Sequence, residues 1–96
     1  MIEIYYIPEE IRKCYSCVRA KELAQETTHE IKMYPIMRIS DNDLGFEYNL
    51  DTIDELKERV GSSRRAFVYP QIFIDGIHIG SLSALQQHVE EVWGFF

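Results

Sequence analysis

Cysteine is scarce in this chain, because only Cys14 and Cys17 occur among its 96 residues. A structural zinc site needs four ligands, and His29, His78 and His88 lack the short histidine spacing that would complete one, so we expect no bound metal. A disulfide between two cysteines so close in sequence would stabilise the fold little, since a loop that short restricts the unfolded chain very little. The Gly-X-Gly-X-X-Gly motif of dinucleotide-binding proteins is also absent.

Long apolar runs and excess positive charge are missing as well. No stretch approaches the ~20 apolar residues of a membrane span, and the first residues, with Glu3, Glu9 and Glu10, lack the basic region of a secretory signal. A net charge of −6 argues against nucleic acid or an anionic membrane as the main partner. We therefore expect a soluble cytoplasmic protein, and its length and 46% hydrophobic content predict one domain over residues 1–96.

The cysteines form the motif Cys14-Tyr15-Ser16-Cys17, which follows an apolar run and opens a helical pattern. Unpaired amides and the positive end of the helix dipole lower the pKa of a thiol at a helix start. In a reducing cytoplasm such a pair is catalytic more often than structural. Basic residues that flank the pair would favour a thiolate and attract an anionic thiol substrate: Arg12, Lys13, Arg19 and Lys21. The motif therefore predicts a redox couple.

Hydrophobic periodicity and turn residues predict seven elements. These are a strand over Met1–Ile7, a helix over Cys17–Thr28, a strand over Glu30–Ile36, a helix that Asp51 caps and Gly61 ends, two strands within Gln71–Ile79 joined at Asp75-Gly76, and a last helix that follows Ser81 or Ser83 and buries Leu85, Val89, Val92 and Trp93. The helical connection predicts that the first two strands are parallel, with a right-handed crossover.

Residues 37–50 have a loop composition without apolar periodicity, and we predict a loop there. The acidic residues Asp41, Asp43 and Glu47 could hold a cation, but their spacing does not match a calcium-binding loop, so a solvated loop is the favoured interpretation.

The order β-α-β-α-β-β-α, with Cys-X-X-Cys at the first helix and X-Pro before the third strand, resembles the thioredoxin fold. Finer motifs over nearly the whole chain resemble glutaredoxins: Cys14-Tyr15-Ser16-Cys17 followed by Val18-Arg19-Ala20-Lys21, Val68-Tyr69-Pro70-Gln71-Ile72-Phe73-Ile74-Asp75-Gly76, and Ile79-Gly80-Ser81-Leu82-Ser83-Ala84-Leu85. The resemblance implies an α/β fold with a mixed four-stranded sheet and helices on both faces. Lys13 and the long middle loop resemble small glutaredoxins encoded by large bacteriophages.

The resemblance also implies an activity, glutathione-dependent reduction of protein disulfides and of glutathione mixed disulfides. Cys14 would be the nucleophile and Cys17 the resolving thiol. Glutathione would be a co-substrate and no cofactor would be tightly bound. A monomer is expected, with ribonucleotide reductase as a client by family analogy.

For glutathione binding, the resemblance implies a cis Pro70 that leaves the backbone of Tyr69 free to pair with the peptide-like substrate. Lys13 or Arg12 would meet the glycyl carboxylate, and the start of the last helix would bind the γ-glutamyl carboxylate. Tyr15 either stacks along the substrate or is simply exposed. The expected glutathione-binding residues are Arg12, Lys13, Tyr15, Val68, Tyr69, Pro70, Gly80, Leu82 and Ser83.

The chain departs from the family pattern in three places. Tyr15-Ser16 stands where Pro-Tyr is usual, Ser81 replaces a second glycine, and Ala84 replaces an aspartate that can meet the glutathione amino group. Two alternatives therefore stay open. One is an iron–sulfur cluster carrier in which two chains hold the cluster through Cys14 and two glutathiones. The other is a thioredoxin-like donor that a flavoprotein reductase, instead of glutathione, reduces.

Overall fold

The computed structural model of the chain describes residues 1–27 and 29–93, and of residues 92 and 93 the backbone alone. Six strands and three helices follow one another in it: β1 (Ile2–Tyr6), α1 (Tyr15–Gln25), β2 (Ile31–Pro35), β3 (Met37–Ile39), β4 (Phe46–Tyr48), α2 (Leu50–Val60), β5 (Gln71–Ile74), β6 (Ile77–Gly80) and α3 (Leu82–Trp93).

Four strands form a mixed sheet in the order β2-β1-β5-β6. β1 and β2 are parallel, whereas the β1–β5 and β5–β6 pairs are antiparallel, as the sequence predicted. The β5–β6 hairpin turns at Asp75 and Gly76, whose φ angles of 50° and 82° are both positive, as a type I′ turn requires. The sheet confirms the thioredoxin-like architecture.

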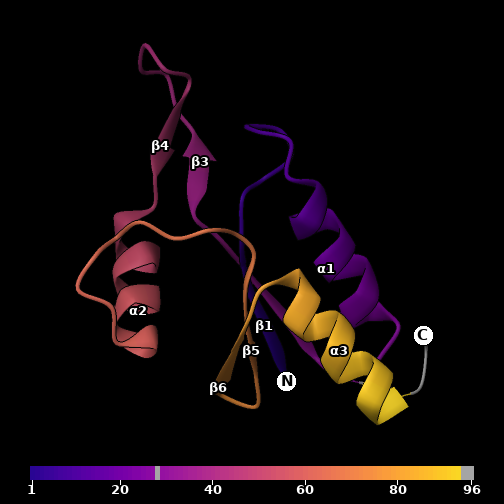
Figure 1. Ribbon diagram of the computed structural model, residues 1–96. Helices are drawn as coiled ribbons and strands as arrows, with labels where there is room; N and C mark the ends of the chain where they lie inside the picture. The colour runs from indigo at the N-terminus through magenta and orange to yellow at the C-terminus, as the bar shows by residue number, and fades with distance from the viewer. Residues whose placement is uncertain (28, 94–96) are drawn as a thin grey trace.

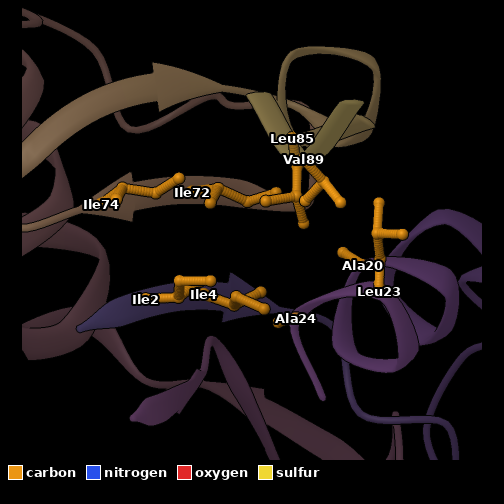
Figure 2. Packing of buried hydrophobic residues seen from close by; sticks show 9 residues of the cluster. All are labelled: Ile2, Ile4, Ala20, Leu23, Ala24, Ile72, Ile74, Leu85 and Val89. Carbon is orange, nitrogen blue, oxygen red and sulfur yellow. The ribbon is translucent and has the colours of Figure 1, made fainter. Parts of the chain in front are cut away.

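Helices α1 and α3 cover one face of the sheet (Figure 1). Alternate residues of β1 and β5 point to this face, because successive side chains of a strand lie on opposite sides. Figure 2 shows this core, in which Leu85 and Val89 of α3 pack near Ile72. The completely buried or nearly buried members are Ile2, Ile4, Ala20, Leu23, Ala24, Ile72, Ile74, Leu85 and Val89. Leu85 and Val89 confirm the predicted stripe of the last helix, while the side chains of Val92 and Trp93 lie outside the described part.

Helix α2 covers the other face. Its buried residues Ile53 and Leu56 pack against Tyr5 of β1 and Phe73 of β5. Gly61 ends the helix with a φ of 70°, a left-handed conformation that glycine adopts without steric cost, as predicted.

Residues 37–50 differ from the prediction, because β3 and β4 form an antiparallel hairpin instead of a loop. Asn42 and Gly45 close its tip: the backbone N–H of Gly45 donates to the Asn42 carbonyl, and the Asn42 side chain donates to the Phe46 carbonyl. Strands of three residues are too short to show periodicity, and the polar tip conceals them. Glu47 accepts hydrogen bonds from Arg38 and Ser40, so the suggested cation ligand already has partners.

Two predicted helix starts were wrong by two residues. The first helix begins at Tyr15 instead of Cys17, since Cys14 itself is the N-cap. It ends at Gln25, and Thr28, its predicted end, lies outside the described residues. The second begins at Leu50, with Asn49 at the N-cap, and Asp51 lies in its first turn. The Asn49 side chain does not cap the helix but donates to the Pro35 carbonyl, which holds the start of α2 against the end of β2.

Candidate active site

Strand directions bring several segments to one end of the sheet. β1 and the parallel β2 both end there, and β5, which is antiparallel to β1, begins there. β6 runs opposite to β5 and so ends there as well. The start of α1, the residues before β5 and the start of α3 therefore lie at this end (Figure 1). It carries every predicted site residue: Arg12, Lys13, Cys14, Tyr15, Cys17, Val68, Tyr69, Pro70, Gly80, Leu82 and Ser83.

Cys14 and Cys17 form a disulfide with a Cα–Cα distance of 5.3 Å. Cys14 has an extended backbone and caps α1 with its sulfur, because the N–H of Cys17 points at Cys14 Sγ with an N–S distance of 3.3 Å. Cys17 is 3% exposed, whereas Cys14 is half-buried. The sulfur at the helix start is therefore the one that a substrate can reach.

A turn after β1 sets the position of Cys14. Pro8 is buried, and its carbonyl accepts hydrogen bonds from the backbone N–H groups of Ile11 and Arg12, each at 3.1 Å. The turn leads into Arg12 and Lys13, which are both exposed. Neither side chain has an ion-pair or hydrogen-bond partner in the described part of the chain. Two cationic side chains thus stand directly before the sulfur, where positive charge favours a thiolate.

Pro70 follows a cis peptide bond after Tyr69, as the resemblance implied. The Pro70 side chain is fully buried, and Val68 just before it is 74% exposed. Burial of the Tyr69 ring raises the pKa of its hydroxyl to about 12, with Tyr48 as a smaller cause, so the phenol stays neutral at physiological pH.

Gln71 holds this segment in place, a role that the sequence analysis missed. Its side-chain Nε2 donates to the Val68 carbonyl at 2.7 Å, and its Oε1 lies 2.7 Å from Nε2 of His78. Because Oε1 can only accept, His78 must carry a proton on Nε2. Burial, with a smaller contribution from the Arg59 charge, lowers the pKa of His78, which favours the neutral ring with that Nε2 proton.

The predicted hairpin contained a signal for this contact. A two-residue turn at Asp75-Gly76 pairs Phe73 with His78, as the structure confirms. Gln71 lies on the same face of β5 as Phe73, because it is two residues earlier. Gln71 and His78 are therefore diagonal neighbours, and the register alone would have placed them together.

The start of α3 forms the remaining side of the site. Gly80 has a φ of 111°, and a side chain added there would lie 3.7 Å from Cβ of Ala84. Leu82 begins the helix, Ser83 is exposed, and the first amides of a helix have no partner within it. The amides near Leu82 and Ser83 thus offer a place for a carboxylate.

Tyr15 is 75% exposed, which agrees with either interpretation of its role, stacking or simple exposure. Within residues 1–27 and 29–93, no cluster of three or more His, Cys, Asp or Glu side chains could hold a metal ion. No helix in the same part of the chain is both long and apolar enough to cross a membrane.

No protein-family model matches this chain. It is 31% identical over 74 residues, 77% of this chain and 70% of the other, to an uncharacterized 11.8 kDa protein from the Gp55-nrdG intergenic region of Enterobacteria phage T4. Solved structures with the same fold include glutaredoxin from Brucella melitensis, with 26% identity, coverage of 95% of this chain and 79% of the other, and a TM-score of 0.57. Glutaredoxin 1 from Francisella tularensis has 24% identity, coverage of 97% and 95%, and a TM-score of 0.58.

A buckwheat glutaredoxin solved in complex with glutathione has 19% identity, coverage of 94% of this chain and 68% of the other, and a TM-score of 0.57. At that identity it supports the fold alone. The fold, which the Brucella melitensis glutaredoxin shares at 26% identity, and the Cys-X-X-Cys pair together are those of a thiol-disulfide oxidoreductase.

Proposed function

We propose that this chain, which belongs to the glutaredoxin family, reduces protein disulfides and glutathione mixed disulfides with electrons from glutathione. One observation carries the proposal: the half-buried sulfur of Cys14 caps α1 and accepts the N–H of Cys17, whose own sulfur is buried. This arrangement separates an attacking sulfur from a resolving one. The exposed Arg12 and Lys13 support it, because they favour the thiolate of the attacking sulfur.

The reaction begins with the reduced pair. The Cys14 thiolate attacks one sulfur of the substrate disulfide, that bond breaks, and the departing thiolate takes a proton. The thiolate of Cys17 then attacks Cys14 Sγ, which releases the second substrate thiol and forms the Cys14–Cys17 disulfide. One glutathione thiolate reopens that disulfide at Cys14, and a second attacks the bound glutathione sulfur. Oxidised glutathione leaves. The two electrons that the two glutathione molecules lost have passed to the substrate disulfide.

We place glutathione across the end of the sheet that carries the cysteines. The backbone of Tyr69 would pair with its cysteinyl residue as a short added strand, held by Pro70 beside it. Lys13 or Arg12 would meet the glycyl carboxylate. The amides of Leu82 and Ser83 would meet the γ-glutamyl carboxylate, a contact that Ala84 cannot supplement as an aspartate would.

The partners follow from the same proposal. Glutathione is a co-substrate and not a resident cofactor, and the protein acts as a monomer in the cytoplasm. A ribonucleotide reductase is the proposed client, which the location of the phage T4 relative in the Gp55-nrdG intergenic region supports.

The test is reduction of a small glutathione mixed disulfide, coupled through glutathione reductase to NADPH oxidation. Wild type should be active, Cys14→Ser inactive, and Cys17→Ser active, because a monothiol route needs Cys14 alone. Inactive wild type would refute the glutathione proposal. Reduction of the same protein by a flavoprotein reductase, or a brown product on anaerobic purification, would then identify the thioredoxin-like donor or the cluster carrier.

A further inference from the structure

A groove runs beside Tyr69, between the residues that precede Pro70 and the base of the β3–β4 hairpin. Its volume is about 340 Å³, and it is open to solvent on one side. Its lining includes Arg12, Tyr48, Leu50, Arg65, Phe67 and Tyr69.

Residues of the β3–β4 hairpin help to form this groove. Figure 1 shows β3 and β4 projecting from the body of the molecule at the end where α1 begins. Tyr48 at the end of β4 and Leu50 at the start of α2 are 50% and 48% exposed, so both present apolar surface to solvent. Phe67 and Tyr69 also line the groove, with ring centroids 6.5 Å apart. The groove is therefore lined largely by apolar and aromatic side chains.

The charged residues that line the groove are basic, whereas the whole chain has a net negative charge. The chain has 16 acidic and 10 basic residues, yet none of the described residues that line the groove is acidic. Arg65 pairs through two nitrogens with Asp54, at 2.7 and 2.8 Å. Arg12 is exposed and makes no such pair among the described residues. A ligand that brings a carboxylate to Arg12 would thus complement the groove.

We propose that the groove binds an extended, acidic segment of the client protein beside its disulfide. The inference rests on the proposed function, because Arg12 lies two residues before Cys14 and Tyr69 is the residue whose backbone would pair with substrate. An apolar side chain of the segment packs between Tyr48 and Tyr69, and a neighbouring carboxylate meets Arg12. The groove thus selects the client, while the cysteines perform the exchange.

The test uses pre-reduced protein in single turnovers, which require no glutathione. The substrates are two synthetic disulfide peptides that carry an apolar residue flanked by two glutamates or by two glutamines. A small mixed disulfide is the third substrate. Wild type should reduce the glutamate peptide about tenfold faster than the glutamine peptide, a ratio that falls with added salt. Equal rates for the two peptides would overturn the proposal.

The variants Tyr48→Ser and Leu50→Ser test the wall directly. Each should lower the rate at which the glutamate peptide is reduced about tenfold, since burial of an apolar side chain is worth more than 1.4 kcal/mol. Neither should change the rate of reduction of the small mixed disulfide. Ile39→Ser is the matched control, because Ile39 is 67% exposed on the same hairpin and does not line the groove. It should leave all three rates unchanged.

The outcomes separate this proposal from the proposed function. If the wild type does not reduce the small mixed disulfide, the proposed function itself is refuted. An unchanged peptide rate in both groove variants, with the small substrate still reduced, would refute the groove alone. A concentration-dependent dimer that Tyr48→Ser dissociates would also refute it, because a second copy would then be the occupant.

Discussion

The two cysteines have the same side chain but different surroundings. Cys14 caps α1 and is half-buried, whereas Cys17 lies one turn further and is 3% exposed. Only the first sulfur combines access to solvent with the donated N–H of a helix start. The proposed roles of Cys14 as nucleophile and Cys17 as resolving thiol rest on this difference.

Gln71 gives a prediction at the same scale. The variant Gln71→Leu removes the donor to the Val68 carbonyl and frees the segment that carries Tyr69 and Pro70. The KM for a glutathione mixed disulfide should rise about tenfold, because binding depends on that backbone, while the free energy of unfolding falls by about 1 kcal/mol. The rate of alkylation of Cys14 by iodoacetamide should not change, since the sulfur itself is untouched.

Gln71→Glu separates a positioning role from a merely space-filling one. It keeps the shape of the side chain but turns an acceptor toward the Val68 carbonyl, so its KM should rise as far as that of Gln71→Leu. A wild-type KM in this variant would contradict the role of the amide donor.

Single residues were predictable from sequence where a local rule applies. The Cys-X-X-Cys spacing predicted the two cysteines that pair in the structure, and the Asp75-Gly76 pair predicted the turn. The hairpin register would have placed Gln71 near His78, but the bond from Gln71 to the Val68 carbonyl depends on the backbone path before Pro70, which the sequence pattern does not give. The N-cap role of Cys14 was missed for a related reason: the apolar pattern begins only after the first turn of the helix.

A cluster of polar side chains links helix α2 to the face of the sheet that it covers. Arg59 near its end donates two hydrogen bonds to the carboxylate of Glu3 in β1, each at 2.9 Å, and a third to the Tyr5 hydroxyl. The guanidinium also lies 3.8 Å from the centre of the Phe73 ring. Tyr34 of β2 donates to the same carboxylate, and burial followed by this contact raises the pKa of Tyr34 to about 12.

Loss of the Arg59–Glu3 pair should destabilise the fold measurably. The side chains are 22% and 14% exposed, and Arg59→Met would leave the Glu3 carboxylate with one remaining donor. The free energy of unfolding should fall by about 2 kcal/mol, which lowers Tm by roughly 10 °C in a domain of this size. Urea unfolding at pH 7 measures the difference.

The effect has a defined pH dependence. The hydrogen bond from Arg59 lowers the pKa of Glu3 below its ordinary value of 4.5. The stabilisation is therefore fully present above pH 4.5 and is lost as pH falls below it toward the folded-state pKa. Wild type and Arg59→Met should converge in acid. Arg65→Met is the matched control, because its pair with Asp54 is exposed and should contribute little. An equal loss in both variants would contradict the account.

Elements with strong periodicity were predicted correctly, and weak ones were not. The three helices and the four strands of the main sheet were expected, with ends displaced by a few residues. The β3–β4 hairpin was missed because each strand has three residues and most of its side chains are exposed, with Ile39 67% exposed although Met37 on the same face is buried. Residues of this hairpin line the groove, so the groove could not be predicted from sequence either.

Charge is unevenly distributed over the whole molecule. The net charge of −6 would repel glutathione at long range, but salt screens charges beyond about 8 Å at physiological ionic strength. Nearby cations therefore decide the local field. Lys13 lies next to Cys14, whereas Lys32 lies near the start of β2, at the opposite end of the sheet.

Matched variants test this distinction. Lys13→Gln and Lys32→Gln change the net charge equally, yet only Lys13→Gln should raise the KM for a glutathione mixed disulfide. An increase of about fivefold corresponds to one charge pair near 4 Å in water, and added salt should reduce it. Similar effects of both variants would show that the net charge, and not the cation beside Cys14, sets the affinity.

The proposed function requires that Cys14 exchange directly with glutathione. Its most direct test is to incubate reduced Cys17→Ser with oxidised glutathione and to locate the product by peptide mass spectrometry, because without Cys17 the mixed disulfide cannot resolve. We expect one glutathionyl group per chain, on Cys14, formed faster than on an unfolded peptide that contains Cys14. No adduct, or a rate no higher than that of the peptide, would contradict the proposed function.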